Sequence, residues 1–172
     1  MLLAALEDPD PVLIFEHKLL YKVKGHVPEA MYHTPLDKAV VRRAGTHATV
    51  AALGIMVQKS LDAAEILAAE GIELEVIDLR CIRPIDSATV VESVKKTTRL
   101  ACVYEAVKSF GIGAEVSALI SESEAFDYLD APIVRLGGAE SPIPYSPILE
   151  KAAVPQVDDI VAGLRALVTK RV

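Results

Sequence analysis

From residue 38 onward, the chain alternates short apolar runs with longer segments of helical periodicity. Strands are predicted at residues 38–42, 48–53, 74–79, 100–104 and 132–136, and helical patterns follow the second, third and fourth of them. Strands separated by helices of roughly ten to fifteen residues favour parallel pairing with right-handed crossovers. Near-continuous apolar strands fit a sheet covered on both faces. The sequence therefore predicts a three-layer α/β/α domain over residues 36–172, with a mostly parallel, mixed sheet of about five strands.

The two ends of this domain carry further signals. Only a short turn at residues 44–46 follows the first strand, so that strand is expected to be the antiparallel one. Asp86 is placed to cap the helix that follows it. Near the C-terminus, apolar residues recur at helical spacing over residues 157–168. We expect this helix to dock on its own sheet; a subunit contact is the alternative.

Residues 1–35 do not fit the repeating pattern. A helical end at residues 2–7 and an apolar strand at residues 12–15 precede a long polar connection. An all-apolar strand needs cover on both faces, and little in the sequence nearby supplies it. Residues 1–35 are therefore interpreted as the remnant of a preceding domain plus a linker. Glu16 and His17, directly after the predicted strand, are candidates to line a site.

Residues 100–120 form the most promising stretch for a ligand site. A buried strand ends at the acidic Glu105, a loop closes on Gly111 and Gly113, and a helix starts near Glu115. Backbone N–H groups at such a helix start can bind anions, so Gly111 and Gly113 form a candidate anion site. The favoured interpretation is that both glycines allow tight strand–loop–helix packing. Glu105 and Glu115 are a candidate carboxylate pair, although Glu115 also complements the helix dipole.

Charge and composition exclude several classes of function. The net charge of -6 argues against nucleic-acid and anionic-membrane partners. His17, His26 and His33 share no compact ligand spacing, which favours a solvated loop over a metal site. Cys81 and Cys102 lie in apolar runs and are expected to be buried thiols of a reducing compartment. Dinucleotide, P-loop, nucleophile-elbow and zinc motifs are absent from the sequence. Residue chemistry alone therefore predicts a non-membrane α/β domain with no recognisable catalytic, cofactor or metal site.

Several stretches, in collinear order, resemble the C-terminal half of the β subunit of thiamine-diphosphate-dependent 2-oxo acid dehydrogenases. The sequences Arg83-Pro-Ile-Asp86 and Phe110-Gly-Ile-Gly113 most resemble the pyruvate dehydrogenase branch of this family. Glu16-His-Lys18 also resembles the acetoin and branched-chain forms. The resemblance covers residues 10–16, 19–21, 71–80, 83–86, 92–97, 110–115, 125–132, 142–145 and 149–150. It implies a transketolase C-terminal-like fold.

The resemblance also implies an oxidoreductase context. In that family, an α2β2 heterotetramer decarboxylates a 2-oxo acid on thiamine diphosphate, held with Mg²⁺, and passes the acyl group to a lipoyl-bearing acyltransferase. The cofactor-activating glutamate and the β-chain active-site histidine lie in the part of the β subunit that this chain lacks. We therefore expect the chain alone to bind no cofactor and to be inactive. The implied location is the cytoplasm, or the mitochondrial matrix in a eukaryote.

The implied role is assembly, with an α subunit, a second β subunit and the acyltransferase's subunit-binding domain as partners. Asp130 matches an acidic residue that faces the basic binding domain of the acyltransferase. The terminal carboxylate, on Val172, is the second carried-over contact, although here the tail is longer and more basic than in the family. Two alternatives stay open: a stand-alone interaction module, and a small α/β domain with an anion site at Gly111 and Gly113.

Overall fold

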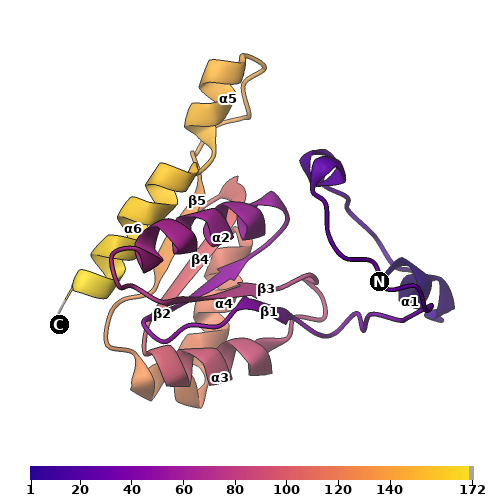
Figure 1. Ribbon diagram of the computed structural model, residues 1–172, viewed down its shortest axis with the longest axis horizontal. Coiled ribbons are helices and arrows are strands. Elements are labelled where there is room, and N and C mark those ends of the chain that lie inside the picture. The colour runs from indigo at the N-terminus through magenta and orange to yellow at the C-terminus, as the bar shows by residue number, and fades with distance from the viewer. Residues whose placement is uncertain (171–172) are drawn as a thin grey trace.

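The five strands form one mixed sheet (Figure 1). The computed structural model describes residues 1–170. The spatial order is β1 (Val40–Arg43), β3 (Leu74–Asp78), β2 (Ala48–Ala52), β4 (Leu100–Val107) and β5 (Val134–Gly138). β1 pairs antiparallel with β3, and the other pairings are parallel. The predicted mixed sheet and its antiparallel first strand are confirmed.

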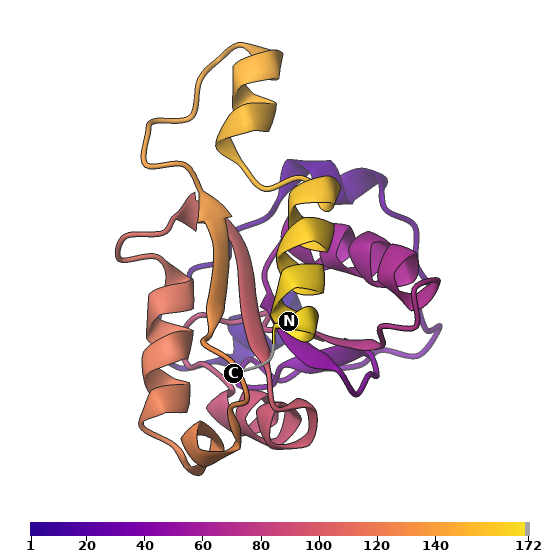
Figure 2. The same ribbon diagram turned by 90° about the vertical axis from the view of Figure 1, so that its left-hand side faces the viewer.

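Helices cover both faces of the sheet, as Figures 1 and 2 show. α2 (Ile55–Ala68) and α6 (Val157–Thr169) pack on one face, around buried residues that include Val50 and Leu164. α3 (Ser87–Thr97) and α4 (Ile112–Ser121) pack on the other, around Ile77 and Leu100. Every residue of β2 is buried, which explains why its sequence lacks polar alternation. The expected docking of the last helix on its own sheet is confirmed.

α3 begins where the sequence predicted, directly after the capping residue Asp86. The Asp86 side chain caps the helix by accepting from the Thr89 backbone N–H at 3.2 Å and from the Thr89 hydroxyl at 2.7 Å. The same carboxylate accepts from the Ala39 N–H at 3.1 Å, which ties the helix start to the residue preceding β1. Burial alone raises the pKa of Asp86, but these hydrogen bonds hold the pKa below its ordinary value.

A buried polar network lies between α3 and the sheet. The Thr49 hydroxyl is 2.6 Å from the Ser93 hydroxyl and 2.7 Å from that of Thr97. Ser93 donates to the Glu75 carboxylate at 2.6 Å, and the Lys96 ammonium pairs with the same carboxylate. Glu75 is only 3% exposed. Each buried polar side chain of this network therefore has a partner, as burial requires.

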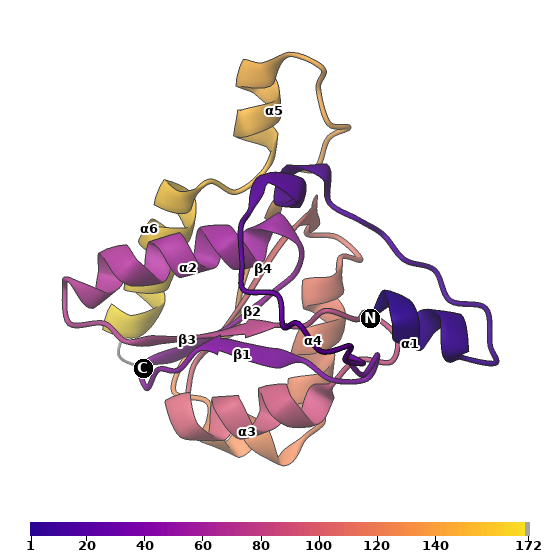
Figure 3. The same cartoon turned by 45° about the vertical axis from the view of Figure 1, so that its right-hand side comes forward.

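The N-terminal segment differs from the prediction at residues 12–15. α1 (Leu2–Glu7) is present, but the predicted strand at residues 12–15 is wrong: no strand forms there, and Phe15 is 88% exposed. An apolar strand is stable only beside a neighbouring strand, and the described residues offer it none. A short 3-10 helix, η1 (Lys18–Lys22), follows and lies near the ends of α2 and β4 (Figure 3).

Two further segments complete the fold. η2 (Glu124–Tyr128), which was not predicted, connects α4 to β5. Beyond β5, the chain projects from the domain as an arm that carries α5 (Pro147–Ala153) (Figure 1). Tyr145 and Ile148 lie exposed on this arm. No helix within residues 1–170 is long and apolar enough to cross a membrane.

Candidate functional site

β4, an interior strand of the sheet, and the glycine loop after it form the stretch that the sequence marked as a candidate ligand site. The strand runs three residues further than predicted, to Val107, so Glu105 lies within it. α4 then begins at Ile112, with Gly111 as its N-cap residue. Figure 2 places β4 behind the edge strand β5 and beside α4. The loop therefore leads directly from the carboxyl end of a central strand into a helix.

Both loop glycines pack against the aromatic ring of Tyr104. A Cβ on Gly113 would lie 2.2 Å from Tyr104 Cε1, and one on Gly111 would lie 2.7 Å from Cε2. A Cβ on Gly137 of β5 would lie 2.8 Å from the same ring. Contacts this short exclude any side chain at these positions. The packing role that the sequence favoured for Gly111 and Gly113 is thus the one that the geometry supports; their anion-binding role stays a prediction.

Tyr104 itself is a buried phenol. Its side chain is 3% exposed, and among the described residues its hydroxyl has no hydrogen-bond partner. Burial raises the pKa of Tyr104, although the nearby Arg135 opposes this shift. The side chain therefore stays neutral at physiological pH and acts as a packing element.

Glu105 has a partner that sequence reasoning did not find. Its Oε2 lies 3.0 Å from Nε2 of His17, 88 residues away in the chain. The candidate pairing of Glu105 with Glu115 gains no support, because Glu115 is exposed in the first turn of α4, where it complements the helix dipole. Burial lowers the pKa of the nearby Lys59, and the Glu105 carboxylate opposes this. No sequence signal links residues 17 and 105.

The three N-terminal histidines are not brought together. His17 contacts Glu105, whereas His33 Nδ1 lies 3.1 Å from a carboxylate oxygen of Glu7. Across residues 1–170, no three His, Cys, Asp or Glu side chains are grouped so that they could hold a metal ion.

The two cysteines differ in exposure. Cys102 is buried as predicted, and burial raises the pKa of its thiol to about 12. Cys81 is partly exposed, so the expectation of a buried thiol is wrong there. It follows β3 just outside the sheet, where the core no longer encloses the chain.

Asp130 lies on the surface, in the loop between η2 and β5. Its carboxylate accepts from the Thr98 hydroxyl at 2.6 Å, and its backbone N–H donates to the Thr98 carbonyl at 2.9 Å. Arg99 Nη1 is 4.0 Å away, and the Asp130 side chain is 59% exposed. The carboxylate is therefore held in a defined position and remains accessible. Val172, the other predicted contact, lies outside the described residues.

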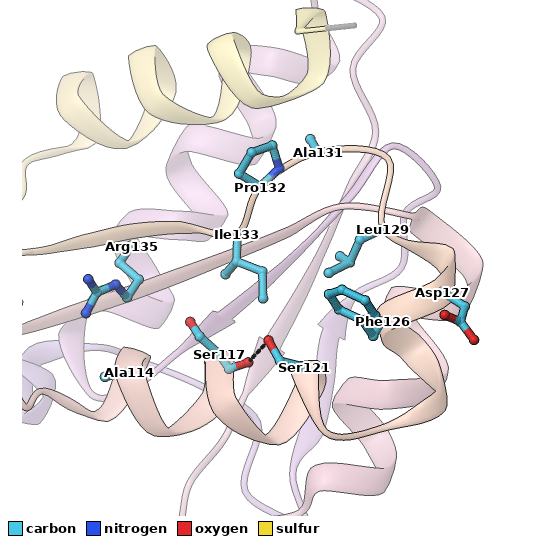
Figure 4. Close-up of a pocket in the computed structure, with 10 residues that line it drawn as sticks. All are labelled: Ala114, Ser117, Ser121, Phe126, Asp127, Leu129, Ala131, Pro132, Ile133 and Arg135. Atoms are coloured by element: carbon cyan, nitrogen blue, oxygen red, sulfur yellow. Dashed lines mark hydrogen bonds between the residues drawn. The ribbon is translucent and has the colours of Figure 1, made fainter. Parts of the chain in front are cut away.

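A groove of about 800 Å³ lies between α4, η2 and β5, and sequence reasoning missed it. Figure 4 shows Arg135 at one end and Phe126 with Asp127 at the other, with Ser117 on the helix between them. Arg135 Nη1 donates to the Lys108 carbonyl at 2.9 Å. The lining comes from consecutive elements within residues 114–135, and the groove depends on how these elements pack, which the sequence pattern does not show.

Comparisons with known proteins agree with the architecture. Residues 37–160 match the family described as the transketolase C-terminal domain. The split-gene transketolase, solved as an inactive beta4 tetramer, superimposes with a TM-score of 0.72 at 27% identity over 87% of this chain and 47% of that one. A 2-oxoglutarate:ferredoxin oxidoreductase from Magnetococcus marinus, 11% identical with a TM-score of 0.52 over 77% of this chain and 20% of that one, shares the fold alone.

Curated relatives are more similar in sequence. The mitochondrial pyruvate dehydrogenase E1 component subunit beta-2 of Oryza sativa subsp. japonica is 47% identical over 96% of this chain and 45% of its own length. The corresponding mitochondrial subunit beta of Bos taurus is 45% identical over 94% of this chain and 46% of its own length. The chain thus spans about half the length of these relatives. It belongs to the transketolase C-terminal domain family and is a homologue of pyruvate dehydrogenase E1 beta subunits, with the fold of their C-terminal domain.

Proposed function

We propose that this chain is the C-terminal assembly and partner-binding domain of the β subunit of a 2-oxo acid dehydrogenase, with pyruvate as the favoured substrate of the intact enzyme. The observation that carries the proposal is the 47% identity to a pyruvate dehydrogenase β subunit along nearly the whole chain. The intact enzyme oxidatively decarboxylates the 2-oxo acid on thiamine diphosphate and transfers the acyl group to an acyltransferase. It acts in the cytoplasm, or in the mitochondrial matrix of a eukaryote.

The exposed apolar side chains of the chain fit an assembly role. Phe110, before α4, and Tyr145, on the arm, are fully exposed, and Ile148 is largely exposed. Large apolar side chains that are left exposed on a domain favour a protein interface. These residues are proposed contacts for the α subunit and the second β subunit. Residues 1–35, with Leu13 and Phe15 exposed, are proposed to come from the preceding pyrimidine-binding domain and its linker.

The residues of this chain do not fit a thiamine diphosphate site. A Mg²⁺-bound diphosphate needs oxygen ligands gathered at one place, and residues 1–170 contain no suitable group of acidic or histidine side chains. The glycine loop is packed against Tyr104. We therefore assign the cofactor to other parts of the intact enzyme and no chemical step to this chain.

Asp130 is the proposed contact for the subunit-binding domain of the acyltransferase. An exposed carboxylate held by Thr98 can meet a basic partner with little loss of side-chain freedom. Charges at the rim of an interface mainly set association rate and specificity. Asp130 is therefore expected to contribute modestly to affinity and clearly to salt dependence.

Asp130→Asn tests this contact directly. We expect the acyltransferase domain to bind the assembled enzyme about two- to fivefold more weakly at low salt, ~0.4–1 kcal/mol, with a shallower salt dependence because one charge contact is lost. Asparagine keeps an oxygen that can accept from Thr98, so the loop should stay folded. Isothermal titration calorimetry at two salt concentrations measures both effects. Asp127→Asn, in η2 nearby, is the matched control; equal affinities of wild type and Asp130→Asn at low salt would refute the contact.

A further inference from the structure

Glu105 and His17 meet at the carboxyl ends of two neighbouring parallel strands. Glu105 comes from the end of β4, and the His17 Nε2 atom lies 3.0 Å from its carboxylate. The His17 ring also faces Gly54, the N-cap residue of α2, two residues after β2: a Cβ on Gly54 would lie 3.6 Å from His17 Cδ2. The imidazole therefore bridges the ends of β4 and β2 from outside the sheet.

This place is the topological switch point of the sheet. β3 lies on one side of β2, and β4 lies on the other. The crossover after β2 leads to β3, and the crossover after β4 leads to β5 on the opposite side, which opens a crevice outside the carboxyl ends of β2 and β4. Such crevices usually hold ligands in open α/β sheets. Here a side chain from the chain's own N-terminal segment lies in it.

The hydrogen bonds of His17 define its tautomer. The Leu19 backbone N–H donates to Nδ1 at 3.3 Å, so Nδ1 carries the lone pair in the neutral ring. Nε2 then carries the proton and donates it to Glu105 Oε2. One ring nitrogen thus caps η1, and the other attaches the turn to the domain.

The remaining hydrogen bonds of this turn are local. The Leu20 N–H donates to the His17 carbonyl, and the Val23 N–H donates to the Leu20 carbonyl. The Tyr21 hydroxyl donates to the Glu16 carboxylate at 2.7 Å. Within the described part of the chain, the His17–Glu105 bond is the only hydrogen bond that joins residues 16–23 to the α/β domain.

We propose that the Glu105 carboxylate is a latch that holds residues 16–23 over the switch-point crevice through His17. The latch determines where residues 1–16 leave the domain and keeps the crevice closed to solutes. Its release would free the segment and expose Gly54 and the first turn of α2. Glu105 is thereby a positioning residue for the N-terminal segment. This role does not depend on the proposed enzyme.

Amide hydrogen exchange of the full chain, measured by NMR, tests the latch. In Glu105→Ala, the Leu19, Leu20 and Val23 amides should exchange about three- to tenfold faster than in wild type, because one partly buried charged hydrogen bond is lost. Glu105→Gln keeps an acceptor for Nε2–H and should stay within about twofold of wild type. Glu92→Gln, an exposed glutamate on α3, is the charge-matched control and should leave these amides unchanged.

His17→Ala provides a second route to the same answer. His17 lies outside both core clusters, so this variant tests the latch even if Glu105→Ala does not fold. It should accelerate amide exchange at Leu20 and Val23 as much as Glu105→Ala does. In the double variant, which carries both substitutions, these amides should exchange no faster than in either single variant. Unchanged exchange in a folded Glu105→Ala or His17→Ala chain, or a Glu105→Gln variant as fast as Glu105→Ala, would overturn the latch.

Discussion

Gly113→Ala is expected to lower the free energy of unfolding by about 3 kcal/mol, or to prevent folding. The added methyl would lie 2.2 Å from the Tyr104 ring. The ring cannot retreat easily, because Gly111 and Gly137 also pack against it: a Cβ on either would lie 2.7 or 2.8 Å from Tyr104 Cε2. Either α4 or the ring must therefore shift within a closely packed interior. Urea unfolding followed by circular dichroism measures the loss.

Two further variants separate overpacking from a general intolerance of substitution. Gly25→Ala adds a methyl where no atom lies within 4 Å, so it should change stability by less than about 0.5 kcal/mol. In a Tyr104→Leu background, the smaller side chain leaves room, and Gly113→Ala should cost clearly less than in wild type. If Gly113→Ala lowered the free energy of unfolding as much in the Tyr104→Leu background as in wild type, the ring contact would be ruled out as the cause.

Glu75→Ala is expected to destabilise the fold by about 3 kcal/mol, the low end for breaking a buried ion pair. The carboxylate accepts from Ser93, from Lys96 and from the Gly45 N–H at 3.3 Å. Removing it leaves the Gly45 amide without its acceptor and takes away one of the two partners of the Ser93 hydroxyl. Lys96 is 47% exposed and can return to water, which limits the cost. Glu75→Gln keeps the shape of the side chain and should lower the free energy of unfolding less. Glu92→Gln, on the exposed side of α3, should leave the free energy of unfolding almost unchanged.

The same carboxylate makes part of the stability depend on pH. Burial alone raises the pKa of Glu75, but the hydrogen bonds from Lys96, Ser93 and Gly45 hold it below its ordinary value. A depressed pKa means that the stabilisation is present above the pKa of an unfolded glutamate, ~4.3, and is lost as pH falls through the folded value. The stability difference between wild type and Glu75→Gln should therefore shrink below about pH 4. A difference that stays constant down to pH 3 would contradict this assignment.

Much of the fold could be predicted because its signals are local. The apolar run of β2, buried throughout, specified a central strand, and Asp86 specified the start of α3. The predicted strand at residues 12–15 was wrong for the opposite reason. Its apolar side chains satisfy the local pattern, but a strand also requires a neighbour, which the described residues do not provide.

The candidate site depended on contacts that no local pattern encodes. Gly111 and Gly113 were correctly interpreted as packing residues, although only the structure identifies Tyr104 as the ring they contact. Glu105 was recognised as an acid near the end of a strand, but its partner His17 lies 88 residues earlier. The groove that ends at Arg135 combines α4, η2 and β5. The His17–Glu105 contact arises because the fold brings distant segments together, whereas the groove is formed by the packing of consecutive elements.

Reconstitution tests the central claim, that this chain supplies assembly and not chemistry. The chain would be co-expressed with the N-terminal half of a related β subunit and with the cognate α subunit, and decarboxylation of pyruvate would be assayed. We expect activity only when all three are present, and equal activity with Asp130→Asn, because that residue is assigned to the acyltransferase. The isolated chain should show neither turnover nor saturable binding of thiamine diphosphate. Turnover or cofactor binding by the isolated chain, or failure of the folded chain to complete the enzyme, would contradict the account.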